Sequence, residues 1–174
     1  MSQIVSSIKP QDIAVIVKLG YLGKKSWRQI DLALELELSQ GEVAKSLSRL
    51  EKLGLIHDKK INKAACLEFL IHGLKYVFPQ IMGPLTLGIA TGLSCLKHQE
   101  AFANGAEGDV YVWPSIDGKI RGQMIQPLYD GLAKAALKDQ KFYEMMSAIE
   151  ILRMGRARER SFAEDFIKKE IRSA

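Results

Sequence analysis

The segment from Ser39 to Gly54 most constrains the fold, because it carries signals for both ends of one short helix. A serine at the N-cap accepts a hydrogen bond from a free backbone N–H of the first helical turn. A glycine is typical of the position just past a helix, where the backbone becomes left-handed. Between them, Val43, Leu47 and Leu50 recur at helical spacing. The pattern predicts an amphipathic helix with one buried face.

Two further helices are predicted before this one. Pro10 is a typical first residue of a helix, and Gly20 and Gly23 are expected to end it. Ser26 is followed three residues later by a glutamine, which is the pattern of a capping box. A second helix is therefore expected from just after Ser26 to about Leu36.

A short β-hairpin is predicted after Gly54. Leu55 and Ile56 favour a strand, residues 57–60 form a polar tip, and Ile61 begins the return. Three short helices followed by a basic hairpin occur in this order in a winged helix-turn-helix. We therefore expect residues 1–62 to form such a domain, with the helix 39–53 as its third helix and the wing at residues 57–61.

The stretch LALELELSQGEVAKSLSRLEKLGLI, from Leu32 to Ile56, resembles bacterial winged helix-turn-helix transcriptional regulators of the MarR, ArsR and Lrp kind. The resemblance extends over roughly residues 10–63. It implies a regulator that binds double-stranded DNA and forms a homodimer through helices outside the DNA-binding domain. A cytoplasmic location is expected because the N-terminal residues do not have the pattern of a signal peptide. The remainder of the chain resembles no family.

The residues expected to contact DNA lie on the third helix and the wing. At about 100° per residue, the basic side chains of the helix fall opposite its apolar face, and a helix in the major groove needs long polar side chains there. Gln40 could address a base edge, serines suit the DNA backbone, and the wing lysines suit a phosphate or the minor groove. The candidate DNA-binding residues are Ser39, Gln40, Lys45, Ser46, Arg49, Lys52, Lys59 and Lys60.

Two observations keep other interpretations open. The net charge of +5 favours a polyanionic partner only weakly. The same helix carries Glu42 and Glu51, which phosphate would repel, so the alternative interpretation of its polar side is a solvated surface. The alternative function is a protein-interaction module built on the winged-helix scaffold, such as an antitoxin or a defence-system partner from a neighbouring gene.

Residues 63–174 are expected to form a helical domain that contains one β-hairpin and binds a partner or an effector. Asn62 should cap a helix that Pro79 stops, and an irregular segment is expected over about 80–108. Residues 109–113 and 119–125 read as two strands of a hairpin that turns at Asp117–Gly118.

The last third of the chain is predicted to be helical. Pro127 should open a helix that reaches Leu137, and another should begin near Lys138. Apolar residues at helical spacing between Phe142 and Ile171 suggest a dimerisation surface. The run of arginines from 153 to 160 favours a solvated face, with a second phosphate-contacting strip or a salt-bridged dimer interface as the alternatives.

The fold class expected is therefore α+β and mostly α, and no catalytic motif suggests an enzyme. Cys95 and His98 have the spacing of a metal-binding pair, but no second pair matches them, so neither a metal nor another cofactor is expected. No apolar run approaches the ~20 residues of a membrane span. A third hypothesis, a small-molecule sensor, would place Tyr111, Trp113 and Tyr129 around a pocket, although aromatic residues in a hairpin more often belong to a core.

Overall fold

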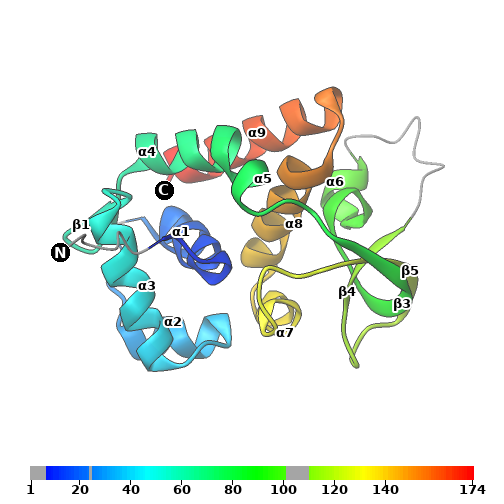
Figure 1. Cartoon of the computed structure of the whole chain (residues 1–174), viewed down its shortest axis with the longest axis horizontal. Coiled ribbons are helices and arrows are strands. Elements are labelled where there is room, and N and C mark those ends of the chain that lie inside the picture. Colours follow the sequence, from blue (N-terminus) through cyan, green and yellow to red (C-terminus); the bar gives the residue numbers. More distant parts are fainter. Residues whose placement is uncertain (1–6, 24, 101–109) are drawn as a thin grey trace.

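The computed structural model describes residues 7–23, 25–100 and 110–174. Helices make up 60% of the structure and strands 15%, which confirms an α+β chain that is mostly helical. Three helices and a short strand pair come first, at the left of Figure 1: α1 (Pro10–Leu22), α2 (Gln29–Leu36), α3 (Gln40–Lys52), β1 (Ile56–His57) and β2 (Lys60–Ile61).

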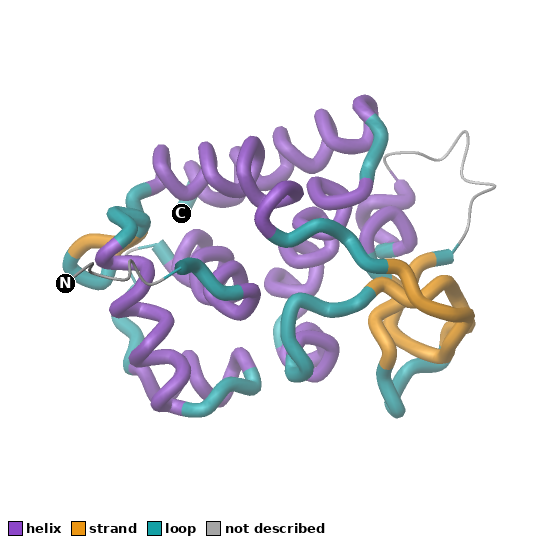
Figure 2. Tube along the Cα trace, in the orientation of Figure 1, coloured by secondary structure: helices purple, strands orange, loops and turns teal. Residues whose placement is uncertain are grey.

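The rest of the described chain forms a helical layer and a small barrel. Figure 2 shows the strands of this barrel at one end of the molecule, away from β1 and β2. The elements are α4 (Lys63–Glu68), a π-helix (Phe69–Gly73), α5 (Leu74–Val77), β3 (Met82–Ala90), a 3₁₀ turn (Gly92–Ser94), α6 (Leu96–Glu100), β4 (Tyr111–Pro114), β5 (Ile120–Ile125), α7 (Leu132–Lys138), α8 (Gln140–Met154) and α9 (Ala157–Arg172).

Helix α1 lies at the centre of the molecule, with α3 on one side and α8 on the other (Figure 1). Every residue from Asp12 to Gly20 is buried. Gly20 was expected to end this helix, but it lies inside it. A Cβ atom at this position would come 3.1 Å from the Ile171 side chain, so a glycine here allows α9 to pack closely. The helix ends at Gly23, where φ is +59°.

The capping predictions for the next two helices had different outcomes. Ser26 does not cap α2. Its N-cap is Arg28, whose guanidinium pairs with Asp31 in the first turn. Ser39 does cap α3, because its hydroxyl accepts a hydrogen bond from the backbone N–H of Glu42 at 3.1 Å. Gly54 follows the end of α3 with φ +70°, as its position predicted.

Strands β1 and β2 form the expected two-stranded antiparallel pair. His57 and Lys60 are partners, and only Asp58 and Lys59 lie between them. Both turn residues have positive φ, at 47° and 62°, as the tightest hairpin turns require. The turn therefore carries two charged residues, both of them exposed.

The helix predicted from Asn62 to Pro79 is interrupted. Asn62 caps α4 by accepting a hydrogen bond from the backbone N–H of Ala65 at 3.2 Å, which confirms the predicted start. The backbone then widens into the π-helix before α5 ends at Val77. The sequence carries no signal for this change of helix type.

The segment 80–108 was predicted to be irregular, and this is wrong for its first half. Residues 82–90 form β3, the longest strand that the structure describes. The rest of the segment includes the 3₁₀ turn and α6, while residues 101–108 lie outside the described part of the chain. The proline and glycines of the segment concealed the strand, because they are depleted in ordinary strands.

The hairpin predicted from β4 and β5 is also wrong. Both strands pair antiparallel with β3, so they run parallel to each other and the three close into a barrel. Gly88 pairs with Pro114 of β4 and also with Ile120 of β5. The connection between β4 and β5 therefore crosses β3 at Gly88. A Cβ atom on Gly88 would lie 2.0 Å from the Trp113 carbonyl oxygen, and one on Gly118 would lie 2.3 Å from Gly88. Only glycine fits at this crossing.

The three last helices complete the core. Helix α7 begins at Leu132, later than the predicted start at Pro127, and Asp139 caps α8 by accepting from the backbone N–H of Phe142 at 3.1 Å. Every residue of α8 from Met145 to Leu152 is buried. The apolar residues predicted as a dimerisation surface between Phe142 and Ile171 therefore fill the interior instead.

One continuous apolar core contains residues from α1 through α9, on both sides of the domain boundary that the sequence suggested at residue 62. In the part of the chain that the structure describes, no helix has the length and apolar character needed to span a membrane.

Candidate nucleic-acid interface

The outer face of α3 is the first component of the candidate site. Ser39 caps the helix at its exposed start, and Gln40, Gly41, Ala44 and Lys45 follow, all of them exposed. Ser48, Glu51 and Lys52 continue this face along the helix. Its small side chains leave the helix surface open to close approach, while its long polar ones reach outward.

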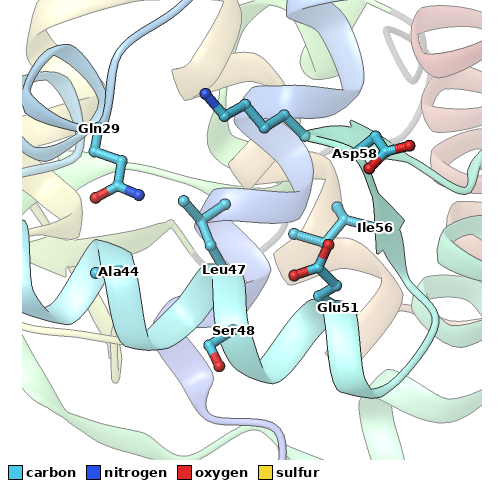
Figure 3. Close-up of a pocket in the computed structure, with 8 residues that line it drawn as sticks. Gln29, Ala44, Leu47, Ser48, Glu51, Ile56 and Asp58 are labelled. Carbon is cyan, nitrogen blue, oxygen red and sulfur yellow. The ribbon is translucent and has the colours of Figure 1, made fainter.

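A groove of about 510 Å³ separates this face from the β1–β2 turn. Figure 3 shows Ala44, Leu47 and Ser48 along α3, with Gln29 on one side and the β1–β2 pair on the other. The floor is apolar, and Glu51 and Asp58 bring carboxylates to its edge. The lining residues are Gln29, Ala44, Leu47, Ser48, Glu51, Ile56, Asp58 and Lys59.

Four of the predicted lysines are exposed on α3 and the β1–β2 turn, and one of them, Lys59, lines the groove. Lys45 and Lys52 are exposed on α3, and Lys59 and Lys60 are exposed at the turn. Among the residues that the structure describes, none of the four forms an ion pair. Lys59 instead lies over the ring of Trp27, with its Nζ 5.9 Å from the ring centre. These ammonium groups are available to an external anion.

Arg49 and Ser46 were also predicted to face DNA, and this placement is wrong. Arg49 is 6% exposed and binds the fully buried Asp12 of α1 through two hydrogen bonds, from Nε at 2.9 Å and from a terminal nitrogen at 2.6 Å. The Ser46 hydroxyl donates to the same carboxylate at 2.5 Å. Hydrogen bonding to Asp12 raises the pKa of Arg49. The two side chains therefore anchor α3 to α1.

The same arginine also compensates the charge of Glu42, one of the two α3 carboxylates that phosphate would repel. Glu42 accepts hydrogen bonds from Arg49 at 2.7 Å and from Gln11 at 2.8 Å. The hydrogen bond from Arg49 lowers the pKa of Glu42, so its negative charge is compensated within the molecule. Glu51 remains an exposed carboxylate on the outer face.

The turn between α2 and α3 is held by α7, which no sequence signal indicated. Glu37 has φ +54° and forms ion pairs with Lys134, at 2.9 Å, and with Lys138. Hydrogen bonds from these lysines lower the pKa of Glu37. Lys138 also donates to the Leu34 carbonyl, and the Tyr129 hydroxyl to the Leu36 carbonyl, both at 2.8 Å. The open carbonyl end of α2 is thereby satisfied from a distant segment.

A second polar contact ties α1 to α2 and α8. Lys18 is 4% exposed, and its Nζ lies 2.6 Å from Glu35 and 2.5 Å from Asp139. The Tyr21 hydroxyl donates to Asp139 as well, at 2.5 Å. The hydrogen bonds from Lys18 and Tyr21 outweigh the effect of burial and lower the pKa of Asp139. Together with the Glu37 contacts, these bonds fix the orientation of α2 and α3.

The aromatic residues considered for a sensor pocket serve the core. Trp113 is fully buried, and its indole N–H donates to Glu150 at 3.0 Å. Arg153 binds the other oxygen of Glu150 at 2.7 Å, so this arginine is not free for phosphate. Burial raises the pKa of Glu150 despite these contacts. The Tyr129 hydroxyl is engaged with α2, as described above.

Cys95 and His98 are buried. The Nε2 atom of His98 lies 2.9 Å from the Glu144 carbonyl oxygen, and burial lowers the pKa of this histidine. Within the described ranges, no three histidine, cysteine or carboxylate side chains gather as a metal ion would require.

Comparison of the chain with family models, with curated proteins and with solved structures found no match. The functional argument therefore depends on the geometry of the residues themselves.

Proposed function

We propose that the protein binds double-stranded DNA as a winged helix-turn-helix regulator of transcription, with α3 in the major groove and the β1–β2 turn as the wing. The observation that carries this proposal is a set of four exposed lysines on α3 and the adjoining turn, none of which forms an ion pair among the described residues: Lys45, Lys52, Lys59 and Lys60. Lysines on a helix and on an adjacent hairpin turn can contact phosphates on two sides of one groove of DNA.

The outer face of α3 supports close contact with base pairs. Gly41, Ala44 and Ser48 are small and exposed, so the helix can approach the base pairs at the floor of the DNA major groove. Gln40 stands at the exposed start of the helix, where an amide suits the edge of adenine. Arg49 takes no part in contact with DNA. It fixes the rotation of α3 through Asp12, which determines that this face points outward.

The first test compares a double variant, Lys45→Ala with Lys52→Ala, with the wild-type protein on a 30-base-pair duplex of random sequence and on the duplex upstream of the protein's own gene. We expect wild-type binding that weakens as salt rises. Losing two phosphate contacts should weaken binding roughly 10-fold and reduce the slope of log K against log[salt] by about 2.

The matched control is Lys119→Ala with Arg121→Ala, which removes two exposed positive charges from the β4–β5 connection and β5, at the barrel end of the molecule. Its affinity should stay within about twofold of the wild-type value, since a distant surface charge contributes little at short Debye lengths. Absence of wild-type binding to both duplexes at low salt, or equal losses in the two variants, would overturn the proposal.

A second function is favoured by the carboxylates at the groove. Glu51 and Asp58 stand beside an apolar floor formed by Leu47 and Ile56. This chemistry suits a protein segment with an apolar anchor and a basic side chain better than it suits phosphate. In this alternative the protein is an interaction module, for example for the product of a neighbouring gene.

The two functions are separated by co-expression with the neighbouring genes. The interaction module should co-purify with a neighbour's product and lose it in a Leu47→Arg variant, while showing no affinity for either duplex at low salt. Salt-dependent binding to DNA without such a partner favours the first function.

A further inference from the structure

Three side chains from α7 and the segment before it bind the end of α2. Lys134 and Lys138 both pair with Glu37, and the Tyr129 hydroxyl donates to the Leu36 carbonyl at 2.8 Å. Figure 1 shows the end of α2 beside α7. We name the contacts of these three side chains with the end of α2 the α7 clamp. The two lysine side chains are 67% and 43% exposed, so the clamp lies at the surface.

The backbone of Glu37 indicates that its side chain has a specific role. Glu37 follows α2 in the left-handed conformation, with φ 54° and ψ 40°, which glycine adopts most readily. Gly54 has a positive φ after α3, at a place where a Cβ atom would meet nothing within 4 Å. A glutamate held in a strained conformation persists where its surroundings stabilise it. Here the stabilising partners are the lysines of α7.

Gly131 allows the segment before α7 to approach Glu37 closely. A Cβ atom on Gly131 would lie 2.7 Å from the Glu37 Cβ and 2.8 Å from the Glu37 carbonyl oxygen. Gly131 immediately precedes α7, and residues 126–131 join α7 to the barrel strand β5. The start of α3 is therefore held by a segment that follows the barrel, far from α3 in sequence.

Helix α3 is held at two places by contacts of different kinds. At its middle, the pair of Asp12 and Arg49 is buried, so dissolved ions screen it little. Glu37 lies just before the Ser39 cap, and its lysine partners are exposed, so salt or a nearby charge weakens these pairs much more easily. The buried pair is permanent in the folded protein, whereas the clamp can be released without unfolding the core.

We propose that the α7 clamp controls the DNA affinity of α3, because it holds the start of that helix where Gln40 and Lys45 act together with the wing. Lys134, Lys138 and Tyr129 are then positioning residues that do not contact DNA. This inference rests on the proposed function and adds the place at which the site is regulated. Separating Glu37 from α7 should lower the DNA affinity although every lysine of α3 and the wing remains in the protein.

The test uses the full chain with Glu37→Ala and Tyr129→Phe, which removes both kinds of clamp contact and no residue expected to bind DNA. Hydrogen exchange is measured at the backbone amides of residue 37 and Leu38, which both donate to the Ala33 carbonyl. We expect exchange at least about 10-fold faster than in the wild type, because the turn opens more often. Circular dichroism checks the fold, and Tyr129→Phe alone replaces the variant if it unfolds.

Affinity for the random 30-base-pair duplex is measured on the same proteins. It should fall at least about 5-fold in the clamp variant. The slope of log K against log[salt] should change by less than the ~0.9 of one phosphate contact, since none is lost. The sign of the change separates positioning from direct contact. If Lys134 and Lys138 bound phosphate themselves, their release from Glu37 would raise the affinity instead.

The matched control is Asp31→Ala. It also removes one carboxylate and one ion pair from α2, but the partner is Arg28, three residues away, and not α7. Its exchange rates at the turn and its affinity should stay within about twofold of the wild-type values. Unchanged exchange in the clamp variant, an affinity that is unchanged or higher, or equal effects of the control would each overturn the proposal.

Failure of the proposed function gives a different result. In that case the wild type binds neither duplex, and control of DNA affinity falls with the function. Faster exchange in the clamp variant would then still show that α7 holds the α2–α3 turn, whereas DNA binding that is insensitive to the clamp overturns this inference alone.

Discussion

Asp12 is the residue that connects the centre of the molecule with α3. Its buried carboxylate receives Ser46 and both donors of Arg49, and it also accepts the backbone N–H of Lys9 at 2.8 Å at the start of α1. One side chain therefore caps the central helix and fixes the rotation of the helix that we expect to enter the major groove.

We expect Asp12→Asn to destabilise the protein by about 3 kcal/mol, because the buried Arg49 loses its fully buried carboxylate partner and keeps only the more exposed Glu42. The measurement is the free energy of unfolding from urea titrations. DNA affinity should fall only as far as the folded fraction falls.

Glu42→Gln is the control for this prediction, since Glu42 is a second, more exposed partner of Arg49. It should cost no more than about 1 kcal/mol. Equal destabilisation by both variants would show that Asp12 is not the principal anchor.

Some of the residues that act on near neighbours in sequence were predictable. Ser39 and Asn62 cap helices within three residues of themselves, and Gly54 adopts the left-handed conformation that its position suggested, whereas Ser26, with an equally local signal, does not cap α2. Arg49 was misplaced because a helical wheel cannot reveal a partner 37 residues away on another helix. The four predicted lysines are exposed, and none of them forms an ion pair in the described part of the chain; their contact with DNA stays a prediction.

At the scale of elements, the barrel depends on the crossing of two chain segments at Gly88. We expect Gly88→Ala to destabilise the protein by about 3 kcal/mol or more, because its Cβ would lie 2.0 Å from a backbone oxygen that cannot move aside cheaply. Thermal unfolding followed by circular dichroism measures the loss.

Gly41→Ala provides the comparison. It lies in α3, and a Cβ there would meet nothing within 4 Å, so replacing glycine in a helix should stabilise the protein by about 0.5–1 kcal/mol. If the two substitutions shifted the melting temperature in the same direction, the crossing would not be as tight as its geometry indicates.

The barrel was the least predictable element. Strands β4 and β5 follow each other closely in sequence, which favours a hairpin between them. Their parallel arrangement depends on β3, some thirty residues earlier, and on glycines that read as turn signals. The pairing of β4 and β5 with the distant strand β3 determines the topology of the barrel, and local sequence patterns do not predict such long-range pairing. The hold of α7 on the α2–α3 turn was missed for the same reason.

At the scale of the whole molecule, the continuous core makes residues 1–62 dependent on the rest. We expect the fragment 1–62 to lack a cooperative unfolding transition, because it exposes the side of α1 that packs on α8 and α9 and leaves Lys18 without Asp139. Calorimetry of the fragment and of the full chain makes the comparison.

The full chain should unfold in one transition, as small cooperative units do. A fragment that melts cooperatively by itself, or a full chain that melts in two separate steps, would show that the boundary suggested at residue 62 separates independent domains. The sequence suggested that boundary because the order of elements typical of a winged helix-turn-helix ends there. That order does not indicate that α1 shares its apolar core with α8 and α9.

The central position of α1 has a consequence for biosynthesis. α1 is translated before every other described element, and α8 and α9 are translated after all the rest. At roughly 5–20 residues per second, on the order of ten seconds separate the first helix from its last partners. During that time the side of α1 that packs on α8 and α9 stays uncovered, so the nascent chain offers chaperones an early target.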